Sequence, residues 1–390
     1  MSIRLRSLIW PILLVTFFVS GAVLYPQFGP HLLADSNNPP VEHIDIRRGT
    51  LPTYNFEAGI DGEIFPALAN YASLQRPKER QIGTFTVTVR NSSDSTLAAR
   101  ISVQVPGWSD METQNVSVAA GEVRKMLFAP AFLPRLYSNR EIAAATAALR
   151  ITDAAGKLLH TETISIRLRS HDDIYWGDNF KFAPFIASWV TPHDPRVEAI
   201  LAQAKEFMPG RRLPGYEEWK SPEQQKAATL AQARAIYRAL QKSGVSYVKS
   251  SLTFGRNTSI SERVRMPSES ISQNSANCID GVVMYASLFE NLGMDPAVIL
   301  VPGHAYIGVR TAQESNDYLY IETAITGRSP FENAVRAAEN GVAKWQEKDV
   351  IRIRVSQARE AGIFPMPLAG HDPRHLPIEE AAASTDASGR

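Results

Sequence analysis

The 390-residue sequence predicts an α+β domain in its second half, preceded by an all-β domain and an N-terminal membrane segment. Three patterns lead to this prediction: an uninterrupted apolar run near the N-terminus, a series of short alternating segments, and then helical and strand patterns that follow one another. The length allows roughly two to three domains, and an apolar content of 44% is sufficient for their cores. We expect boundaries that divide the chain into residues 1–26, 27–62, 63–170, 171–367 and 368–390.

Residues 1–26 have the pattern of a membrane anchor. The apolar run of residues 8–25 carries no charge and follows Arg4 and Arg6, which favours a single transmembrane helix with the rest of the chain outside the cytoplasm. Ser20-Gly21-Ala22 offers the small residues that signal peptidase requires, so a cleaved signal peptide is the alternative. A retained anchor would place the protein on the inner membrane facing the periplasm, and a cleaved one would release it.

Residues 63–170 have the pattern of an immunoglobulin-like β-sandwich. The preceding residues 27–62, which include a polar and proline-rich stretch, are typical of a linker. Alternating apolar segments recur at residues 84–90, 99–105, 116–118, 123–128, 147–152 and 160–168. About six or seven strands without a long helix are typical of such a sandwich, although a single cysteine excludes the disulfide of antibody domains. The sequence leaves two roles open for this domain: a spacer and a protein-binding module.

The second half alternates helices and strands. Ser221 and Gln224 form a capping-box pattern for a helix that continues to about Lys242. Ser329-Pro330-Phe331-Glu332 is expected to cap another helix, and residues 350–355 have the pattern of a closing strand. We expect residues 263–271 to form a polar loop.

Cys278 is the only cysteine in the chain, and it lies at the expected start of a helix. Apolar residues at helical spacing follow it as far as Leu292, and Gly293 suits the left-handed residue that ends a helix. Asn277 is the expected N-cap, and Asp280 then occupies the third helical position. A thiolate in the first turn faces free N–H groups and the positive end of the helix dipole, which favours reactivity.

Two strands after this helix carry a histidine and a carboxylate. Residues 304–309 and 318–324 have strand patterns, and a turn centred near Gln313 would put His304 almost opposite Glu322. Cross-strand neighbours share a face about 5 Å apart. The carboxylate could then orient the imidazole while the other ring nitrogen faces the thiol, as nucleophilic catalysis requires.

With these motifs, Asn277-Cys278-Ile279-Asp280 and Pro302-Gly303-His304-Ala305, the chain resembles the transglutaminase-like superfamily, which is related to papain. The resemblance extends loosely from Ser188 to Pro365 and is closest to bacterial membrane-attached members. It implies a papain-like α+β fold, a Cys-His-acid triad, and thiol chemistry on amides, either hydrolysis of peptides or isopeptides or acyl transfer. Glu322 replaces the usual Asp, and Ile279 stands where animal transglutaminases and papain carry an aromatic residue.

Gln273 lies five positions before Cys278. Papain-like enzymes use a glutamine upstream of the cysteine to bind the oxyanion, so the resemblance implies this role for Gln273, together with the Cys278 backbone N–H. A solvated glutamine with no catalytic role is the alternative.

Other functions remain open or are disfavoured. A lone cysteine is often a packing residue, and the chain could be a non-catalytic envelope scaffold that binds proteins and retains only the fold. A net charge of +1 gives no electrostatic case for nucleic acid. His371 and His375 have a metal-like spacing, but Pro373 disfavours a regular helix there. We therefore expect no metal and no cofactor, and a protein, peptide or cell-wall peptide as the substrate.

Overall fold

The computed structural model describes residues 51–75, 82–218, 220–249 and 261–367. The expected membrane segment, most of the expected linker, the C-terminal tail and the histidine pair at 371 and 375 lie outside these residues. In the part of the chain that the structure describes, no helix combines the length and apolar character that a bilayer span requires.

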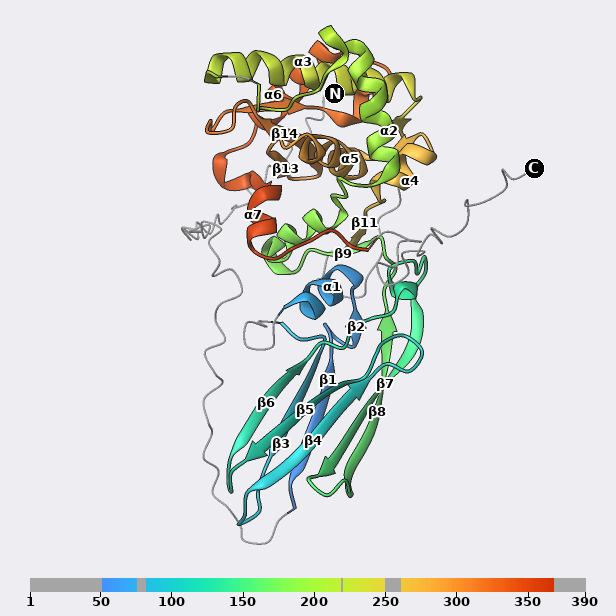
Figure 1. Ribbon diagram of the computed structural model, residues 1–390, viewed down its shortest axis with the longest axis vertical. Helices are drawn as coiled ribbons and strands as arrows, with labels where there is room; N and C mark the ends of the chain where they lie inside the picture. The colour runs from blue at the N-terminus through green and yellow to red at the C-terminus, as the bar shows by residue number, and fades with distance from the viewer. Residues whose placement is uncertain (1–50, 76–81, 219, 250–260, 368–390) are drawn as a thin grey trace, which may run out of the picture.

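The chain forms a mixed α and β structure in which the first part is almost entirely β (Figure 1). Its strands make two sheets. The three-stranded sheet has the order β1-β3-β6 and the five-stranded sheet the order β2-β8-β7-β4-β5. Their bounds are β1 (Thr53–Ala58), β2 (Glu63–Ile64), β3 (Phe85–Arg90), β4 (Leu97–Gln104), β5 (Glu112–Val118), β6 (Val123–Phe128), β7 (Ala143–Asp153) and β8 (Leu158–Leu168).

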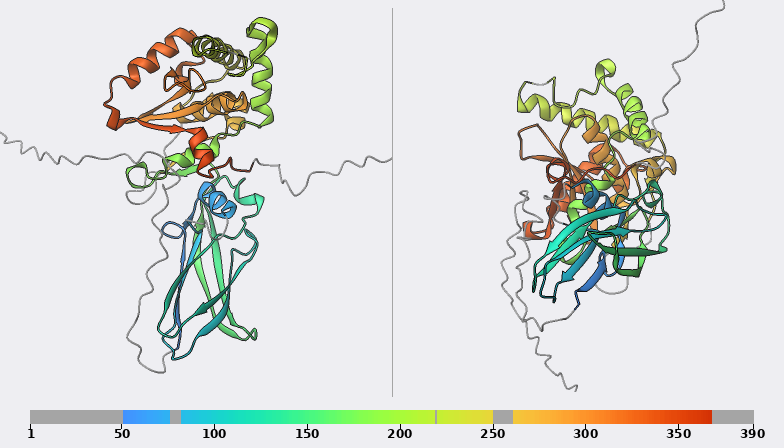
Figure 2. Two further views of the ribbon diagram at one scale, coloured as in Figure 1. Left: turned by 60° about the vertical axis from the view of Figure 1, so that its left-hand side comes forward. Right: turned by 60° about the horizontal axis from the view of Figure 1, so that its bottom comes forward.

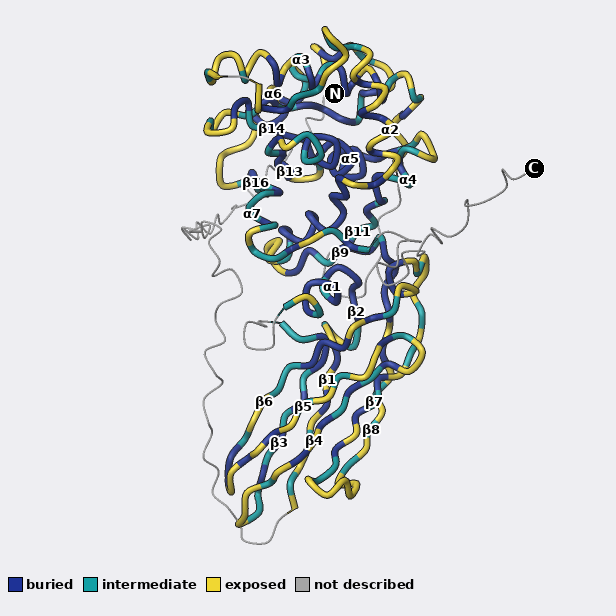
Figure 3. Tube along the Cα trace, viewed as in Figure 1, coloured by how far each residue is buried: buried dark blue, intermediate teal, exposed yellow. Residues whose placement is uncertain are grey.

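One apolar core lies between these two sheets. Alternate residues of β3, namely Phe85, Val87 and Val89, join Ile101 and Ile151 of the other sheet in that core. The alternation follows from the strand geometry, because successive side chains point to opposite faces. Each fully buried side chain of this kind contributes about 1.5–3 kcal/mol of transfer free energy. Residues that alternate with these core residues along the strands are coloured as exposed or intermediate in Figure 3.

One expectation for this region needs correction. The linker was expected to continue to residue 62, but residues from Thr53 onward form β1, which pairs antiparallel with β3 and buries Phe56 and Ala58. So short an alternating stretch forms a strand only because β3 supplies hydrogen-bond partners for its backbone. The all-β region also contains a helix, α1 (Pro66–Leu74), which begins with a proline at its first position.

Helix α1 lies at the junction between the two halves (Figure 1). Tyr71 of α1 packs edge-on against Phe185, with ring centroids 5.2 Å apart. Phe185 belongs to the 3₁₀ segment η3 (Ala183–Trp189), and Ala358 of helix α7 (Val355–Glu360) joins the same buried cluster. Asn70 Nδ2 also donates to the Pro365 carbonyl at 3.3 Å. The first part of the chain is therefore packed against both ends of the second.

The second half is built on a four-stranded antiparallel sheet in the order β15-β14-β13-β16. These strands are β13 (Pro296–Val301), β14 (His304–Arg310), β15 (Tyr318–Ile321) and β16 (Ile351–Arg354). Helix α5 (Cys278–Asn291) packs with one face through residues such as Ile307 and Val309, whereas α6 (Phe331–Val342) packs with the other through Tyr306. Figure 2 shows helices on both sides of this sheet.

Two further helices, α2 (Pro195–Ala204) and α3 (Pro222–Lys242), complete the layer around α5. The expected cap of α3 is confirmed, since Ser221 Oγ accepts a hydrogen bond from the Gln224 N–H at 3.3 Å. The expected cap of α6 is wrong, because its N-cap is Pro330, which has no side chain that could accept such a bond. The expected loop at residues 263–271 instead contains β11 (Ser261–Arg263) and helix α4 (Pro267–Ser272). Strand β11 forms only because β9 (Asp173–Tyr175), distant in sequence, pairs with it.

Helix α5 is the central element of this half. Nearly all of its residues are buried, and it is the dark segment labelled α5 in the upper part of Figure 3. Its expected limits are confirmed, because Asn277 is the N-cap and Gly293, with φ of 67°, follows the C-cap Leu292. The sequence predicted an apolar stripe on this helix, whereas the structure surrounds it on all sides.

Candidate functional site

Cys278 is the first residue of α5 and is partly exposed. Asn277 Oδ1 accepts a hydrogen bond from the Asp280 N–H at 2.8 Å, and Asp280 Oδ2 accepts one from the Asn277 N–H at 3.0 Å. This reciprocal cap fixes the first turn of a 14-residue helix. The thiol therefore lies at the positive end of a helix whose start is rigidly held.

Asp280 also binds the segment that precedes α4. Its Oδ1 accepts a hydrogen bond from the Arg265 N–H at 2.8 Å, and the Arg265 guanidinium lies 3.4 Å from Oδ2. Burial raises the pKa of Asp280, although these hydrogen bonds and the arginine oppose that shift. One buried carboxylate thus ties the helix that bears Cys278 to a loop that approaches from another part of the chain.

His304 and Glu322 meet beside Cys278. His304 Nε2 lies 2.7 Å from Glu322 Oε2, while Glu322 Oε1 accepts a hydrogen bond from the Ala324 N–H at 2.9 Å. Hydrogen bonds to Cys278 and then to Glu322 raise the pKa of His304 to about 10, against the opposing effect of burial. Because Nε2 is engaged by Glu322, Nδ1 is the ring nitrogen left to face the thiol. The three side chains predicted from the sequence are therefore brought together.

The way in which Glu322 reaches His304 differs from the expected cross-strand pair. The observed register pairs Ile307 with Ile321 and Arg310 with Tyr318, so its continuation would put His304 opposite Ala324. Strand β15 ends at Ile321, and Glu322 is instead the N-cap of the 3₁₀ segment η6 (Thr323–Ile325). Its carboxylate reaches His304 diagonally from this turn, because the backbone there has left the sheet.

Segment η6 is held close to the start of α5. Thr323 Oγ1 donates to the Cys278 carbonyl at 3.2 Å. At Gly281 a Cβ atom would lie only 2.6 Å from Thr323 Oγ1 and 2.8 Å from Thr323 Cβ. Only glycine permits this approach, so Gly281 sets the distance between the helix of Cys278 and the turn of Glu322. An interior glycine in a helix pattern was the sequence signal for such a contact.

The histidine is also supported by an aromatic neighbour. The ring of Tyr306 meets the ring of His304 edge-on, with centroids 4.7 Å apart. The Tyr306 hydroxyl in turn lies against α6 at Gly341, where a Cβ would be 2.1 Å from it. Helix α6 therefore supports the imidazole through Tyr306, a contact that the sequence analysis did not identify.

Gln273, the expected oxyanion residue, follows α4 as its C-cap and is exposed. Its backbone N–H donates to the Glu269 carbonyl at 2.9 Å. The helix thus fixes the backbone of Gln273, and the catalytic role of its side chain stays a prediction.

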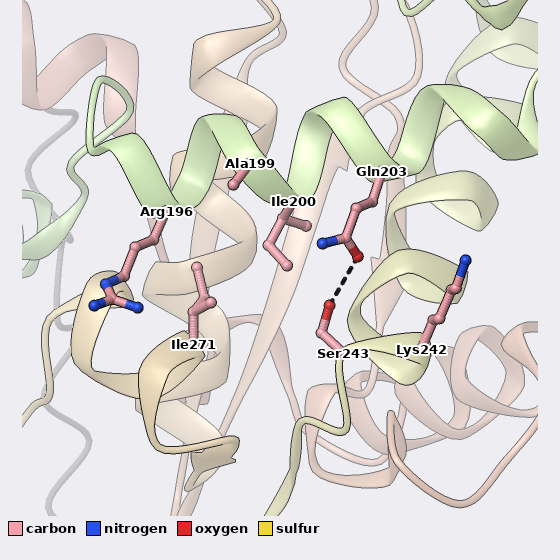
Figure 4. Close-up of a pocket in the computed structure, with 7 residues that line it drawn as sticks. All are labelled: Arg196, Ala199, Ile200, Gln203, Lys242, Ser243 and Ile271. Atoms are coloured by element: carbon pink, nitrogen blue, oxygen red, sulfur yellow. Dashed lines mark hydrogen bonds between the residues drawn. The ribbon is translucent and has the colours of Figure 1, made fainter.

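A separate hollow of about 520 Å³ lies between α2, the end of α3 and α4 (Figure 4). Ile200 and Ile271 form part of its wall, and Ser243 donates to Gln203 Oε1 at 3.1 Å across it. None of its lining residues belongs to the Cys278 site. Across the described residues, no group of three or more histidine, cysteine or acidic side chains is placed to hold a metal ion.

Comparison with known proteins finds no family model that matches this chain and no matching curated protein.

The contact at Gly281 predicts that Gly281→Ala displaces η6. The added methyl group would overpack the contact with Thr323 and cost about 1–3 kcal/mol of stability. It would also move Glu322 away from His304 and slow alkylation of Cys278. Chemical unfolding and mass spectrometry of the alkylated protein measure the two effects. Restored reactivity is expected in the double variant Gly281→Ala, Thr323→Gly, which frees the space; its absence would contradict this explanation.

The ion pair between His304 and Glu322 predicts that the free energy of unfolding depends on pH. Because the folded-state pKa of His304 is about 10, the stabilisation from the charged ring is complete below pH about 6.5 and is lost as the pH rises through about 10. Its size is on the order of 1–3 kcal/mol, allowing for partial exposure of the ring. Unfolding curves between pH 6 and about 10.5 measure this loss. His304→Gln should remove that part of the slope, and an unchanged slope would count against the ion pair.

Proposed function

We propose that this protein is a transglutaminase-like thiol enzyme that acts on amide bonds. One observation carries the proposal: Cys278, at the capped start of a helix, is hydrogen-bonded to an imidazole that a buried carboxylate holds at 2.7 Å. Each member has the position that its role requires. A thiol at a helix start is readily ionised, an adjacent imidazolium stabilises the thiolate, and an anchored acid fixes the imidazole.

The arrangement of the elements supports a papain-like domain of the transglutaminase type. The cysteine helix precedes an antiparallel sheet and packs on one of its faces, the histidine begins the second strand, and the acid follows the third. The two sheets around one core in the first part of the chain support an immunoglobulin-like sandwich. Its strand order and its inserted helix α1 are features of this chain.

The proposed reaction has two stages. The Cys278 thiolate attacks the amide carbonyl and forms a C–S bond, and the oxyanion accepts hydrogen bonds from the Cys278 N–H and from Gln273. His304 transfers its proton to the nitrogen of the leaving amine, and the C–N bond breaks. Neutral His304 then takes a proton from water, or from an acceptor amine, which attacks the thioester and releases the acyl group. Glu322 keeps the imidazole in place throughout.

We further propose that the protein is anchored to the inner membrane by its N-terminal segment and acts outside the cytoplasm on protein, peptide or cell-wall peptide substrates. The apolar run after Arg4 and Arg6 supports this orientation. Alkaline phosphatase fused after residue 390 is expected to be active in whole cells. An inactive fusion, with an active β-galactosidase fusion at the same position, would reverse the orientation. A mature N-terminus at Val23 would replace the anchor with a cleaved signal peptide.

The enzyme proposal predicts a hyperreactive Cys278. At neutral pH, iodoacetamide should alkylate the folded protein about tenfold or more faster than the unfolded chain, whose thiol has an ordinary pKa of about 8.5. His304→Ala should remove most of this advantage. Glu322→Gln should slow amide turnover more than alkylation, because it weakens the charge and orientation of the imidazole. Since the chain has one cysteine, mass spectrometry reports this site alone.

Two outcomes would change the assignment. Alkylation that occurs only after unfolding would make Cys278 a packing residue and exclude the enzyme. Rapid alkylation without turnover of any peptide or isopeptide amide would favour the alternative of a non-catalytic envelope scaffold that retains the fold.

A further inference from the structure

The hollow between α2, the end of α3 and α4 has a cation at each end (Figure 4). Arg196 is the second residue of α2, and Lys242 is the last residue of α3. Gln203 lies seven residues after Arg196 on α2, and it is hydrogen-bonded to Ser243, which directly follows Lys242. Seven residues of an α-helix span about 10 Å. The backbones that carry the two cations are therefore separated by roughly two turns of helix.

Neither cation is neutralised within the part of the chain that the structure describes. Arg211, on a nearby exposed segment, forms an ion pair with Glu206, whereas no described acid pairs with Arg196 or Lys242. No acidic residue lines the hollow. A concave surface with two cations and no acid attracts a ligand that carries negative charge.

Apolar side chains form the floor of the hollow between the two charges. Ile200 is buried, Ile271 is half-buried, and Ala199 lies beside them. Gln203 Oε1 accepts the hydrogen bond from Ser243, so the amide nitrogen of Gln203 points toward Ile200 (Figure 4). Among the described residues this nitrogen has no hydrogen-bond partner. A ligand that fits therefore has an apolar group between two anionic groups, together with a hydrogen-bond acceptor.

The walls of the hollow are joined to the segment that leads to α5. The Asn274 side-chain amide, with its nitrogen turned toward two carbonyl groups, donates to the Ser243 carbonyl at 2.8 Å and to the Ile271 carbonyl at 3.0 Å. Asn274 directly precedes β12 (Ser275–Ala276), which pairs in parallel with β10 (Ser246–Tyr247). A ligand in the hollow therefore contacts residues whose backbones are tied to the start of the cysteine helix.

We propose that this hollow binds an acidic peptide segment in which an apolar residue lies between two carboxylates. The carboxylates pair with Arg196 and Lys242, and the apolar side chain packs on the floor of the hollow. Gln203 donates to a carbonyl group of the segment. Alternate residues of an extended chain share one face, and five residues span roughly 13 Å, which the long cationic side chains can reach. The inference goes beyond the proposed function and does not depend on the thiol chemistry.

Fluorescence polarisation of a labelled peptide on the full chain tests the proposal. The probe is an amidated Gly-Glu-Gly-Leu-Gly-Glu-Gly with fluorescein at its N-terminus, used at low ionic strength because salt screens exposed charges. We expect saturable binding. Replacing the leucine with glycine should weaken it about tenfold, because the apolar contact is lost. Replacing both glutamates with glutamine should weaken it at least as much.

Variants of the protein locate the charges that matter. Arg196→Glu reverses one of them and should lower the affinity about tenfold or more, and Lys242→Gln should lower it severalfold. Glutamate is favourable in the first turn of a helix, so the first variant keeps α2 folded. The matched control is Arg150→Glu, which makes the same charge change at an exposed residue of β7. It should retain the wild-type affinity.

Hydrogen exchange shows where the peptide lies. Saturating peptide should slow amide exchange in α2 and α4 and leave the strands of the first part of the chain unchanged. Protection confined to other segments would overturn the assignment of the hollow.

Three further results would overturn the proposal. These are the absence of saturable binding, an equal loss of affinity in Arg150→Glu and Arg196→Glu, and equal affinities of the leucine and glycine peptides. Displacement of the probe by pyrophosphate at the concentration at which unlabelled peptide displaces it would show an anion site without selectivity for peptides. None of these results bears on the alkylation of Cys278, so this proposal and the proposed function fail separately.

Discussion

The buried carboxylate of Asp280 is the interaction on which the site depends. It accepts hydrogen bonds from the backbone N–H groups of Asn277 and Arg265 and faces the Arg265 guanidinium. Burial alone would favour its neutral form, as the raised pKa indicates. The surrounding donors offset this cost only when the loop and the helix are both in place. The start of the cysteine helix and the approach of the Arg265 loop therefore form together or not at all.

The same network extends to the first part of the chain. Strand β9 follows directly from the β-rich region and pairs with β11, and the Val264 N–H donates to the Asp172 carbonyl at 2.7 Å. Asp173, which is fully buried, lies 3.0 Å from Arg169. Arg265 is only two residues beyond β11. The β-rich region is thus connected through a few buried polar contacts to the helix that bears Cys278, in addition to the apolar cluster around Tyr71.

Close packing sets the remaining distances in the site. Gly281 allows Thr323 to approach α5, and Gly341 allows the Tyr306 hydroxyl to approach α6. The first contact determines where Glu322 lies, and the second supports the edge of His304. Because packed interiors yield little to an added methyl group, these two glycines, together with the hydrogen bonds, fix the positions of the imidazole and the carboxylate.

Local sequence determined the elements that need only near neighbours. The cap at Asn277, the end of α5 at Gly293 and the start of α3 at Ser221 were predictable because each depends on residues within a few positions. The order of cysteine, histidine and acid was likewise sufficient to nominate three side chains. The strand that was expected to carry Glu322 was predicted too long, because its end depends on where η6 meets α5 and not on its own alternation.

Only the tertiary structure decided which distant segments meet. Arg265 reaches Asp280, β9 pairs with β11, and β10 pairs with β12, although nothing in the local pattern of these short stretches names a partner. Strands of two or three residues carry too little periodicity to specify a register. Their pairing is chosen by the surrounding core and by buried groups that must find hydrogen-bond partners. The sequence by itself therefore determined the helix that begins at Cys278, and the packing of remote segments determined the geometry around that cysteine.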